Sequence, residues 1–339
     1  MILRTRIRES IYTRTTITIM DKEWNLQDIN VQSLLDGYDK EKILDIRKLD
    51  FIGVEGRDVY NITVPFLSAG REYIAGRVEL REDEFNSKVM FFLRKDDTWV
   101  LDENAPVFLM QDPFVCIIDD EIIFGGVEIF LENGNKDYRT IFLRGKDIYD
   151  LKIFTQGPKG MKDIRLLQLP IGEIGLFTRP QGEIGGRGRI GFMKISSIVR
   201  LVRLRHKDYF DVPLLKCNFL DEEWLGVNAA YVLKNGLIGV LGHIACYTMD
   251  AQAKPNKNYY PIAFALDEQM NIPIGMKILS ARADYPSGKS KFGTLRNVLF
   301  AGGITRHDNG TATMYVGAGD AESYAVKMHD PFLEYELGK

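Results

Sequence analysis

The chain has 339 residues, of which 45% are hydrophobic and 27% are charged, as in an ordinary soluble protein with a substantial core. Its 44 basic and 47 acidic residues give a formal charge of −3, which offers no basic footprint for nucleic acid. No apolar run reaches the length of a membrane span, and the Arg-containing start lacks the apolar segment of a signal peptide. We therefore expect neither a nucleic-acid nor a membrane partner.

The three cysteines, Cys116, Cys217 and Cys246, lie in apolar surroundings without metal-binding spacing. This pattern is typical of buried free thiols in a reducing compartment, so we expect a cytoplasmic protein. No spacing of His, Cys and carboxylate residues indicates zinc or iron, and no nucleophile elbow indicates a serine hydrolase. The sequence thus predicts no metal and no cofactor.

Residues 1–50 differ from the rest and are predicted to form an N-terminal extension. A strand-like run covers residues 11–19, and residues 31–49 contain helix-permissive stretches. We expect this part to pack on the outside of the main body, or to contribute a strand that closes it. From residue 51 to residue 339, Gly and β-branched residues dominate and helical periodicity nearly disappears, which indicates an all-β domain.

Hairpin-like segments recur through this domain, and each opens with a polar residue. They begin at Asn61, Asp112, Arg165, Asn228 and Asn297, at separations of 51 to 69 residues. Units of about fifty residues with several strands each favour propeller blades. The sequence predicts a five-bladed β-propeller in which the opening polar residues line a central funnel; a pair of β-sandwiches is the competing architecture.

The second of these segments is the most distinctive. Asp112 precedes Pro113, whose φ is fixed by its ring, and an apolar run follows to Ile118. Asp119 and Asp120 form a tight polar turn before a second apolar run, so two strands joined as a hairpin are predicted. Asp112 is a candidate catalytic carboxylate, against the ordinary interpretation of an Asp-Pro turn. Glu128, late in the returning run, is either functional or simply exposed to solvent.

Cations gather around the third segment, at Lys159, Lys162, Arg165, Arg179, Arg187 and Arg189. Arginines in Gly-rich surroundings can donate in pairs to phosphate oxygens, although charge runs are usually solvated loops. Arg165 and Arg179 bracket one hairpin, so one or both are expected at its funnel end. His243 lies in an apolar strand and is either a phosphate contact or a satisfied core group. Asp320, between small residues, is either a sugar-binding group or a turn residue.

Five motifs, in the same order along the chain, resemble those of the five-bladed β-propeller phosphorylases and hydrolases that act on β-mannosides. Gln111-Asp112-Pro113 resembles the family's Glu-Asp-Pro-Arg motif, with Gln111 and Phe114 as departures. KDIRLLQLP resembles its Lys-Asp-…-Leu-Phe-Pro segment, and Thr178-Arg179-Pro180 its His-Arg-Pro. Residues 226–244 resemble the family's segment that ends in Tyr-His-Gly, and residues 297–326 resemble its closing segment, which ends in Tyr-Tyr-Gly-Ala-Ala-Asp. The nearest match is the β-1,2-mannosyltransferase/phosphorylase branch, related to glycoside hydrolase family 130.

The resemblance implies a role for each candidate. Asp112 is the general acid of an inverting reaction in which phosphate attacks the anomeric carbon, so that no second carboxylate is needed. Arg179 and His243 match phosphate-binding positions, whereas Arg165 stands where the family commonly has Asn. The family's sugar-binding positions correspond to Asn61, Arg77 and Asp320. The resemblance also places Arg77 within reach of phosphate. Asn228 is added to them from its place at the head of a repeat.

The sequence therefore favours an inverting mannoside phosphorylase or mannosyltransferase acting on β-1,2-linked manno-oligosaccharides, with mannose 1-phosphate as product or donor. The resemblance also leaves open a nucleotide-sugar donor such as GDP-mannose. The alternatives are an inverting hydrolase, in which Glu128 or Asp320 activates water, and a non-catalytic carbohydrate-binding propeller. The expected partners are a manno-oligosaccharide and phosphate or a sugar phosphate. Oligomeric state stays open, with the N-terminal fifty residues available to mediate a dimer.

Overall fold

The protein was examined as a computed structural model, which describes residues 29–81, 83, 86–217, 219–249, 253–269 and 271–338. These residues are nearly all in strands and turns, with a few short helices. The helices are α2 (Val31–Asp36), α3 (Ile198–Val202), α4 (His206–Phe210) and α5 (Leu333–Glu336). The all-β class predicted from the sequence is confirmed. The strand predicted at residues 11–19 lies outside the described residues.

The strands form four hydrogen-bonded sheets in the described part of the chain. The first contains β2 (Phe51–Ile52), β3 (Asp58–Tyr60), β4 (Phe66–Ser68), β5 (Arg71–Glu79), β6 (Lys88–Lys95) and β7 (Thr98–Leu101). The second contains β8 (Gln111–Ile118), β9 (Glu121–Glu132), β10 (Asn135–Gly145) and β11 (Lys152–Gln156), and the third β12 (Arg165–Gln168), β13 (Ile174–Thr178) and β14 (Gly191–Ile195).

The fourth sheet has eight strands in two antiparallel parts. One part contains β15 (Trp224–Val232), β16 (Ile238–Met249), β17 (Pro255–Asp267) and β18 (Ile272–Ile278). The other contains β19 (Asn297–Arg306), β20 (Thr311–Ala318), β21 (Glu322–His329) and β1 (Ile43–Lys48). The two parts join through a parallel pairing of β17 with β19, at Asn258 with Asn297 and at Tyr259 with Val298.

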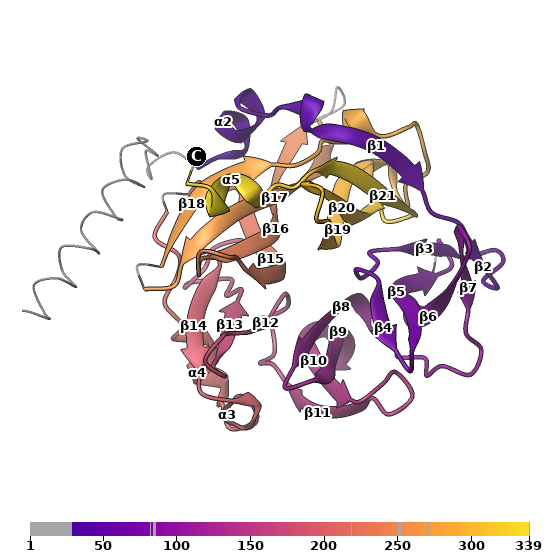
Figure 1. Cartoon of the computed structure of the whole chain (residues 1–339), viewed down its shortest axis with the longest axis horizontal. Coiled ribbons are helices and arrows are strands. Elements are labelled where there is room, and N and C mark those ends of the chain that lie inside the picture. Colours follow the sequence, from indigo (N-terminus) through magenta and orange to yellow (C-terminus); the bar gives the residue numbers. More distant parts are fainter. Residues whose placement is uncertain are drawn as a thin grey trace, which may run out of the picture.

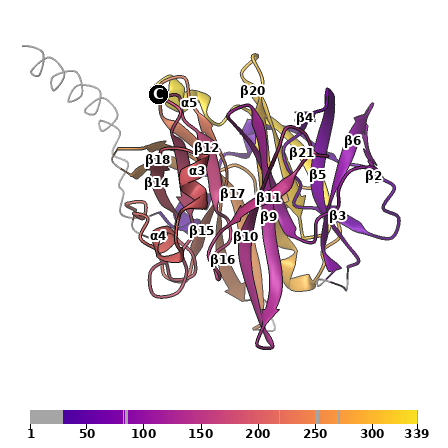
Figure 2. The ribbon, with the colours of Figure 1, turned by 90° about the horizontal axis from the view of Figure 1, so that it is seen from below.

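The sheets stand in a ring about a common centre, in chain order (Figure 1). Strands β8 and β12 contact each other, β12 contacts β15, β15 contacts β19 and β19 contacts β8, although these strands come from the second sheet, the third sheet and the two parts of the fourth. The ring therefore brings the beginnings of widely separated segments together. Hairpin β9–β10 extends past the neighbouring strands on one side of the molecule (Figure 2).

Hydrophobic clusters fill the spaces between neighbouring strand groups. One joins β5 and β6 to β9 and β10, around Phe91 and Phe124, and the next joins the second and third sheets. A third cluster joins the third sheet to β15–β17, a fourth joins β16 and β17 to β19–β21, and a fifth joins β21 back to the first sheet. Because every strand group is packed on both sides, the inner strands are held in fixed relative positions.

The described part of the N-terminal region, from residue 29, contributes a strand to the fourth sheet and a helix that packs against it. Strand β1 pairs antiparallel with β21, with Ile46 opposite Val326, and so adds an N-terminal strand to the C-terminal part of the fourth sheet. Helix α2 begins with an Asn30 capping box and packs against β16 and β18. The backbone N–H of Val31 donates to both carboxylate oxygens of Glu223, at 3.0 and 3.1 Å.

The predicted Asp112 hairpin is present. Strands β8 and β9 pair antiparallel from Ile118 opposite Glu121, and the turn residues Asp119 and Asp120 have φ values of +52° and +60°. Two successive left-handed residues are the geometry of a type I′ hairpin turn, which Asp tolerates better than most residues. Neighbouring backbone approaches β9 closely at Gly125 and Gly126. A Cβ at Gly125 would lie 2.4 Å from the Ile141 carbonyl oxygen, and a Cβ at Gly126 would lie 2.6 Å from the Gln111 carbonyl oxygen.

Candidate active site

Asp112 is the second residue of β8 and lies at a β-bulge, where the pairing with β9 shifts between Gln111 and Phe114. Its φ is +50°, a left-handed conformation that costs an Asp about 1 kcal/mol. The amide nitrogen Nδ2 of Asn61 donates to Asp112 Oδ1 at 2.8 Å, and Arg77 Nη1 lies 3.4 Å from the same oxygen. Both of these donors act on the same carboxylate oxygen, Oδ1.

A buried carboxylate fixes the orientation of Arg77. Glu79 Oε2 accepts from Arg77 Nε at 3.1 Å and from Nη2 at 3.0 Å, and Glu79 also accepts from Tyr60, Ser87 and Lys291. Burial alone would raise the pKa of Glu79, but the Arg77 charge and these hydrogen bonds outweigh it and hold the pKa below its ordinary value. Glu79 is therefore an ionised anchor that holds Arg77 against Asp112.

Asp320 lies in the turn between β20 and β21 and shares this environment. Burial, followed by the negative charge of Asp112, raises its pKa above the ordinary value, although Arg77 and Lys291 act in the opposite direction. Asn61 packs against the adjacent Gly317, where an added Cβ would lie 2.3 Å from Asn61 Oδ1. That buried Oδ1 has no hydrogen-bond partner among the described residues. A buried acceptor without a partner among the described residues thus belongs to the side chain that donates to Asp112.

On the neighbouring segments a group of cations surrounds Asp163. Arg179 Nη1 lies 3.0 Å from Asp163 Oδ2, and Arg165 Nη2 lies 3.8 Å from Oδ1. Burial would raise the pKa of Asp163, but Arg179, Lys162 and His243 with Arg165 lower it to about 2. Both arginines are 3% exposed, which excludes the interpretation of a solvated basic loop for them.

Backbone carbonyls complete the positioning of the two arginines. Arg179 Nε donates to the Leu225 carbonyl at 2.7 Å, and Arg165 Nε donates to the Asn228 carbonyl at 2.9 Å. The Arg165 guanidinium also lies 4.4 Å from the centroid of the Phe114 ring. Phe114, which replaces the Arg expected from the family motif, therefore supports a cation on the next sheet instead of supplying one.

His243 is buried beside this cation group. Its Nδ1 lies 2.8 Å from Asn228 Oδ1, and its ring stacks on Tyr259 with centroids 5.2 Å apart. Burial lowers the pKa of His243 to about 3, assisted by the charges of Arg179, Lys162 and Arg165 and opposed by Asp163. The imidazole is therefore neutral at physiological pH. Asn228 Nδ2 is buried without a hydrogen-bond partner in the described part of the chain, so a donor is available here.

The two halves of the site are contiguous. The charge of Asp112 acts on Arg77 and Asp320 on one side and on Lys162 and Arg165 on the other. All eight residues selected from the sequence thus fall into one connected group, although they come from several sheets. The list is Asn61, Arg77, Asp112, Arg165, Arg179, Asn228, His243 and Asp320. Two of them do not head a strand as predicted: Asn228 sits at a bulge within β15, and Asn61 directly follows β3, which ends at Tyr60.

Other sequence candidates lie elsewhere. Glu128 is paired with Arg139, whose Nε lies 2.6 Å from Glu128 Oε2. Lys159 pairs with Glu132 at the tip of β9, and Arg187 is exposed. Asn297, which heads the last repeat, donates to Asn258 at 2.8 Å. A polar residue at the head of a repeat therefore does not always lie in the site.

A family model described as a protein of unknown function (DUF1861) matches residues 37–334 of the chain. The chain belongs to this family. Two solved structures from Leishmania mexicana are similar to this DUF1861 chain. MPT-4, a mannose phosphorylase in complex with a phosphate ion, is 34% identical over 89% of this chain and 93% of its own, with a TM-score of 0.81. MPT-1, a GDP-Man-dependent mannosyltransferase, is 31% identical over 89% and 96%, with a TM-score of 0.77.

A more distant neighbour is the β-1,2-mannobiose phosphorylase from Listeria innocua, 16% identical over 87% of this chain and 99% of its own, with a TM-score of 0.58. At that identity the likeness concerns the fold. A search of curated proteins gave no match. The family named from the motifs is confirmed, and with it the class of an enzyme of glycosyl transfer or phosphorolysis.

Four important residues of this DUF1861 site were not selected from the sequence. The sequence indicates Lys162 only as part of a cation run, and the prediction does not include Asp163, Glu79 or Lys291. The Lys162-Asp163 pair lies inside the KDIRLLQLP motif, so the motif held the signal for both. Glu79 and Lys291 are 212 residues apart in the chain, and nothing local in the sequence links them.

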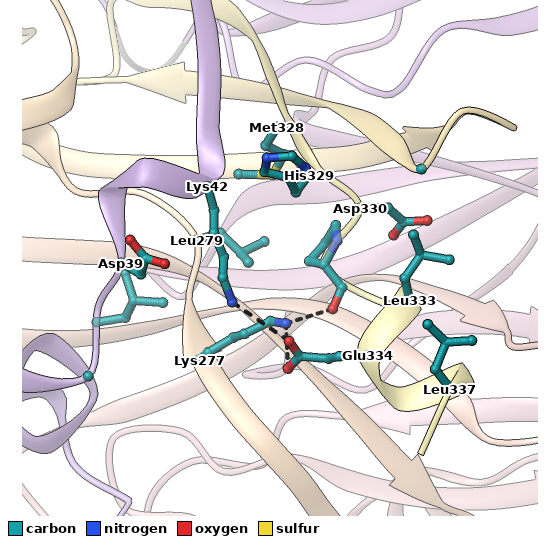
Figure 3. A pocket seen from close by; sticks show the side chains of 14 residues that line it. Asp39, Lys42, Lys277, Leu279, Met328, His329, Asp330, Leu333, Glu334 and Leu337 are labelled. Carbon is teal, nitrogen blue, oxygen red and sulfur yellow. Dashed lines mark hydrogen bonds and ion pairs between the residues drawn. The ribbon is translucent and has the colours of Figure 1, made fainter. Parts of the chain in front are cut away.

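A separate pocket of about 260 Å³ lies at the outer side of the ring, between β18, the end of β21 and α5 (Figure 3). Its two lysines are already paired: Lys277 Nζ lies 2.7 Å from Glu334 Oε1, and Lys42 Nζ lies 3.7 Å from Oε2. None of the selected site residues lines this pocket.

No cluster of three His, Cys, Asp or Glu side chains placed to hold a metal occurs within the described ranges. The helices of these ranges are too short or too polar to cross a membrane. All three cysteines are free and partly buried.

Proposed function

We propose that this chain is an inverting mannoside phosphorylase or mannosyltransferase that acts on β-1,2-linked manno-oligosaccharides. The observation that carries the proposal is the pairing of the Asp112 carboxyl group with the adjacent cation group around Asp163. A phosphorylase needs one acid and an anion site, whereas an inverting hydrolase needs an acid and a base. The site provides the first combination.

Asp112 supplies the proton. In phosphorolysis the bond between C1 of the terminal mannose and the glycosidic oxygen breaks, and the proton from Asp112 reaches that oxygen through a hydroxyl of the bound mannose. A phosphate oxygen forms the new bond to C1 from the opposite face, which gives mannose 1-phosphate with inverted configuration. In the synthetic direction the same atoms move in reverse, and Asp112 takes the proton back.

The cation group holds the phosphate. Lys162, Arg165 and Arg179 carry three positive charges and Asp163 carries one negative charge, so the group has two net positive charges. This balance matches a phosphate dianion, and the guanidinium groups can donate to its oxygens in pairs. The neutral His243 adds no charge, but it fixes Asn228, whose unpartnered Nδ2 is a further donor.

Asn61, Arg77 and Asp320 hold the mannose that occupies the centre of the site, with Asn228 completing the set. Asn61 Oδ1 is a buried acceptor without a partner in the described residues, and a sugar hydroxyl is the kind of donor that satisfies it. Asp320 and Arg77 provide an acceptor and donors on the same side.

We infer a five-bladed propeller from the packing described above. The eight-stranded sheet divides at its short parallel pairing into two blades, and each of the five hydrophobic clusters then fills one space between adjacent blades. Residues 51–339 form this domain and residues 1–50 form the extension that adds β1 to the last blade. The free cysteines support a cytoplasmic location.

The names of the similar proteins favour the same chemistry. MPT-4 is a mannose phosphorylase and MPT-1 uses GDP-mannose, so transfer to or from phosphate and transfer from a nucleotide sugar both occur on related chains. The alternatives are weaker. Glu128, one of the two candidate bases for a hydrolase, forms an ion pair with Arg139, which weakens the hydrolase hypothesis. No observation on the described residues favours a non-catalytic propeller.

Product analysis tests the proposal. The enzyme is incubated with β-1,2-mannobiose with and without inorganic phosphate, and mannose and mannose 1-phosphate are quantified. We expect mannose 1-phosphate only when phosphate is present. Free mannose released at the same rate in both reactions would indicate a hydrolase, and calorimetric binding of the sugar without turnover, with mannose 1-phosphate and GDP-mannose also tested as donors, would indicate a binding protein.

A further inference from the structure

The loop that joins β18 to β19, residues 279–296, packs on the turn that carries Asp320. An added Cβ at Gly319 would lie 2.8 Å from the Lys289 carbonyl oxygen, and the backbone N–H of Lys291 donates to the Gly319 carbonyl at 2.8 Å. The φ of Asp320 is +51°, a conformation that surrounding contacts must hold in place. The loop backbone supplies such contacts, so its position is transmitted to Asp320.

The side chain of Lys291 reaches a second part of the site. Lys291 is 7% exposed, although most of the neighbouring loop is exposed to solvent. Its ammonium group donates to Oε1 of Glu79 on β5, which lies 212 residues away in the chain. The other oxygen of Glu79 accepts from Arg77 Nη2 at 3.0 Å. Lys291 and Arg77 therefore share one buried carboxylate.

A charge on this side chain is not needed to fill the space. Removing an ammonium group from water is unfavourable unless the group is paired, and a buried ion pair is often no more stable than apolar side chains of similar volume. A methionine at position 291 would occupy a similar volume without that cost. The positive charge of Lys291 therefore indicates an electrostatic role at the site.

That role concerns the charge of Arg77. Glu79 accepts from Arg77 Nε and Nη2, and its negative charge alone would cancel that of the guanidinium. Because Lys291 balances Glu79, the charge of Arg77 stays available to Asp112, whose Oδ1 lies 3.4 Å from Nη1. Burial raises the pKa of Asp320, and Arg77 and Lys291 both oppose that rise, so the Lys291 charge also acts on Asp320.

We propose that Lys291 is a positioning residue that couples two sugar-binding groups, Arg77 and Asp320. Its ammonium group holds Arg77 through Glu79, and its backbone holds the turn of Asp320. This inference rests on the proposed function, in which both groups contact the central mannose. One loop residue thus sets the relative position of two groups that come from β5 and from the β20–β21 turn.

The phosphate half of the site is held by other contacts. Its two arginines, Arg165 and Arg179, are fixed by Asp163 and by backbone carbonyls of β15. Loss of the Lys291 charge is therefore expected to weaken the binding of sugar and to leave the binding of phosphate unchanged. A general loss of folding would weaken both, so phosphate affinity serves as the internal measure of an intact site.

Calorimetry with β-1,2-mannobiose and with inorganic phosphate tests the inference, with phosphorolysis measured in parallel. In K291M we expect the Kd for mannobiose to rise at least about tenfold, as for the loss of one charge-assisted hydrogen bond, while the Kd for phosphate changes by less than about twofold. K291R keeps the charge and should restore most of the sugar affinity. K289M, from the same loop, and R189A, which removes a surface pair with Asp221, should change neither Kd.

A double variant tests whether Lys291 acts through Glu79. E79Q removes the negative charge that Lys291 balances, so the two changes are expected to be non-additive. E79Q/K291M should bind mannobiose no more weakly than E79Q does. Losses of affinity that add in the double variant would mean that the two residues act independently, which would contradict the proposed coupling.

Unchanged mannobiose affinity in K291M would overturn the inference, and so would parallel losses of mannobiose and phosphate affinity. Failure of the proposed function gives a different result. Phosphorolysis by the unaltered enzyme, with sugar affinity independent of Lys291, would leave the proposed function standing and remove this role. Sugar affinity that depends on Lys291, in a chain that forms no mannose 1-phosphate, would support the positioning role and contradict the proposed function.

Discussion

Four polar residues of the site have left-handed backbone: φ is +46° at Asn61, +50° at Asp112, +60° at Asp163 and +51° at Asp320. Each such residue costs about 1 kcal/mol, and Asn and Asp are the side chains that tolerate it best. Strain gathered in one place indicates that the surrounding contacts impose the geometry. The sequence identified three of these residues by type and motif, but it could not show their conformation, which depends on neighbouring sheets.

Arg179 provides a prediction about the proposed phosphate site. In R179K the positive charge remains, but the paired donors toward Asp163, Leu225 and phosphate cannot all be replaced by one ammonium group. We expect the Kd for phosphate to rise about tenfold, as for the loss of one charge-assisted hydrogen bond. Calorimetry measures it, with R189A as the control. Unchanged phosphate affinity in R179K would remove Arg179 from the anion site.

His243 makes the free energy of unfolding depend on pH. Its folded pKa of about 3 lies below the ordinary 6.5, so the unfolded chain binds the proton more readily, and stability is lost as the pH falls below 6.5. The loss is about 1.4 kcal/mol for each pH unit below that value. The neighbouring charges are Asp163, Arg165, Arg179 and Lys162.

H243Q is expected to remove this contribution, because Gln does not titrate. Urea denaturation of both proteins at pH 8 and at pH 5.5 measures it. The advantage of the unaltered protein over H243Q should shrink by about 1 kcal/mol at the lower pH. An advantage that is the same at both pH values would mean that His243 is protonated as readily in the folded protein as in the unfolded chain.

At the scale of single elements, the sequence pattern was sufficient to predict structure that depends only on neighbouring residues in the chain. The β8–β9 hairpin follows from two apolar runs and the Asp-Asp turn between them, and all of these can be recognised in the sequence. Asn228 was expected at the head of a strand, yet it occupies a bulge in the middle of β15. A bulge depends on how the partner strand β16 is packed, which the sequence of β15 alone does not contain.

The Asp119–Asp120 turn gives a prediction for this element. D120G replaces a residue at φ +60° with one that adopts this conformation without strain. We expect stabilisation of about 0.5–1 kcal/mol in urea denaturation, with phosphorolysis unchanged, because the turn is at the opposite end of β8 from Asp112. D120A, which keeps a Cβ, is the control. Destabilisation by D120G would mean that the Asp120 side chain makes a necessary contact.

At the scale of the whole molecule, the ring is closed by strand β1. Its pairing with β21 connects residues near the two ends of the described chain, and Leu49 and Ala325 share a hydrophobic cluster with the first sheet. The sequence offered this closure as one of two arrangements. It could not decide between them, because pairing between distant strands depends on the assembled ring.

I46P tests the importance of this closure. Proline cannot donate to the sheet and is disfavoured within a paired strand, and Ile46 faces Val326 in the middle of β1. We expect a fall in Tm of several degrees, corresponding to a loss of about 2–3 kcal/mol. I52P, in the two-residue outer strand β2, should cost less. Equal Tm values for I46P and the unaltered protein would mean that β1 does not secure the ring.

One variant tests the proposed role of Asp112 as the lone proton donor facing a phosphate site. D112N keeps the shape of the side chain and can still contact Asn61, but it has no acidic proton to transfer. The measurement is the rate of mannose 1-phosphate formation from β-1,2-mannobiose and phosphate, with sugar binding followed by calorimetry. We expect a loss of turnover of about 10³-fold or more with sugar binding retained. Phosphorolysis by D112N at a near-normal rate would contradict it.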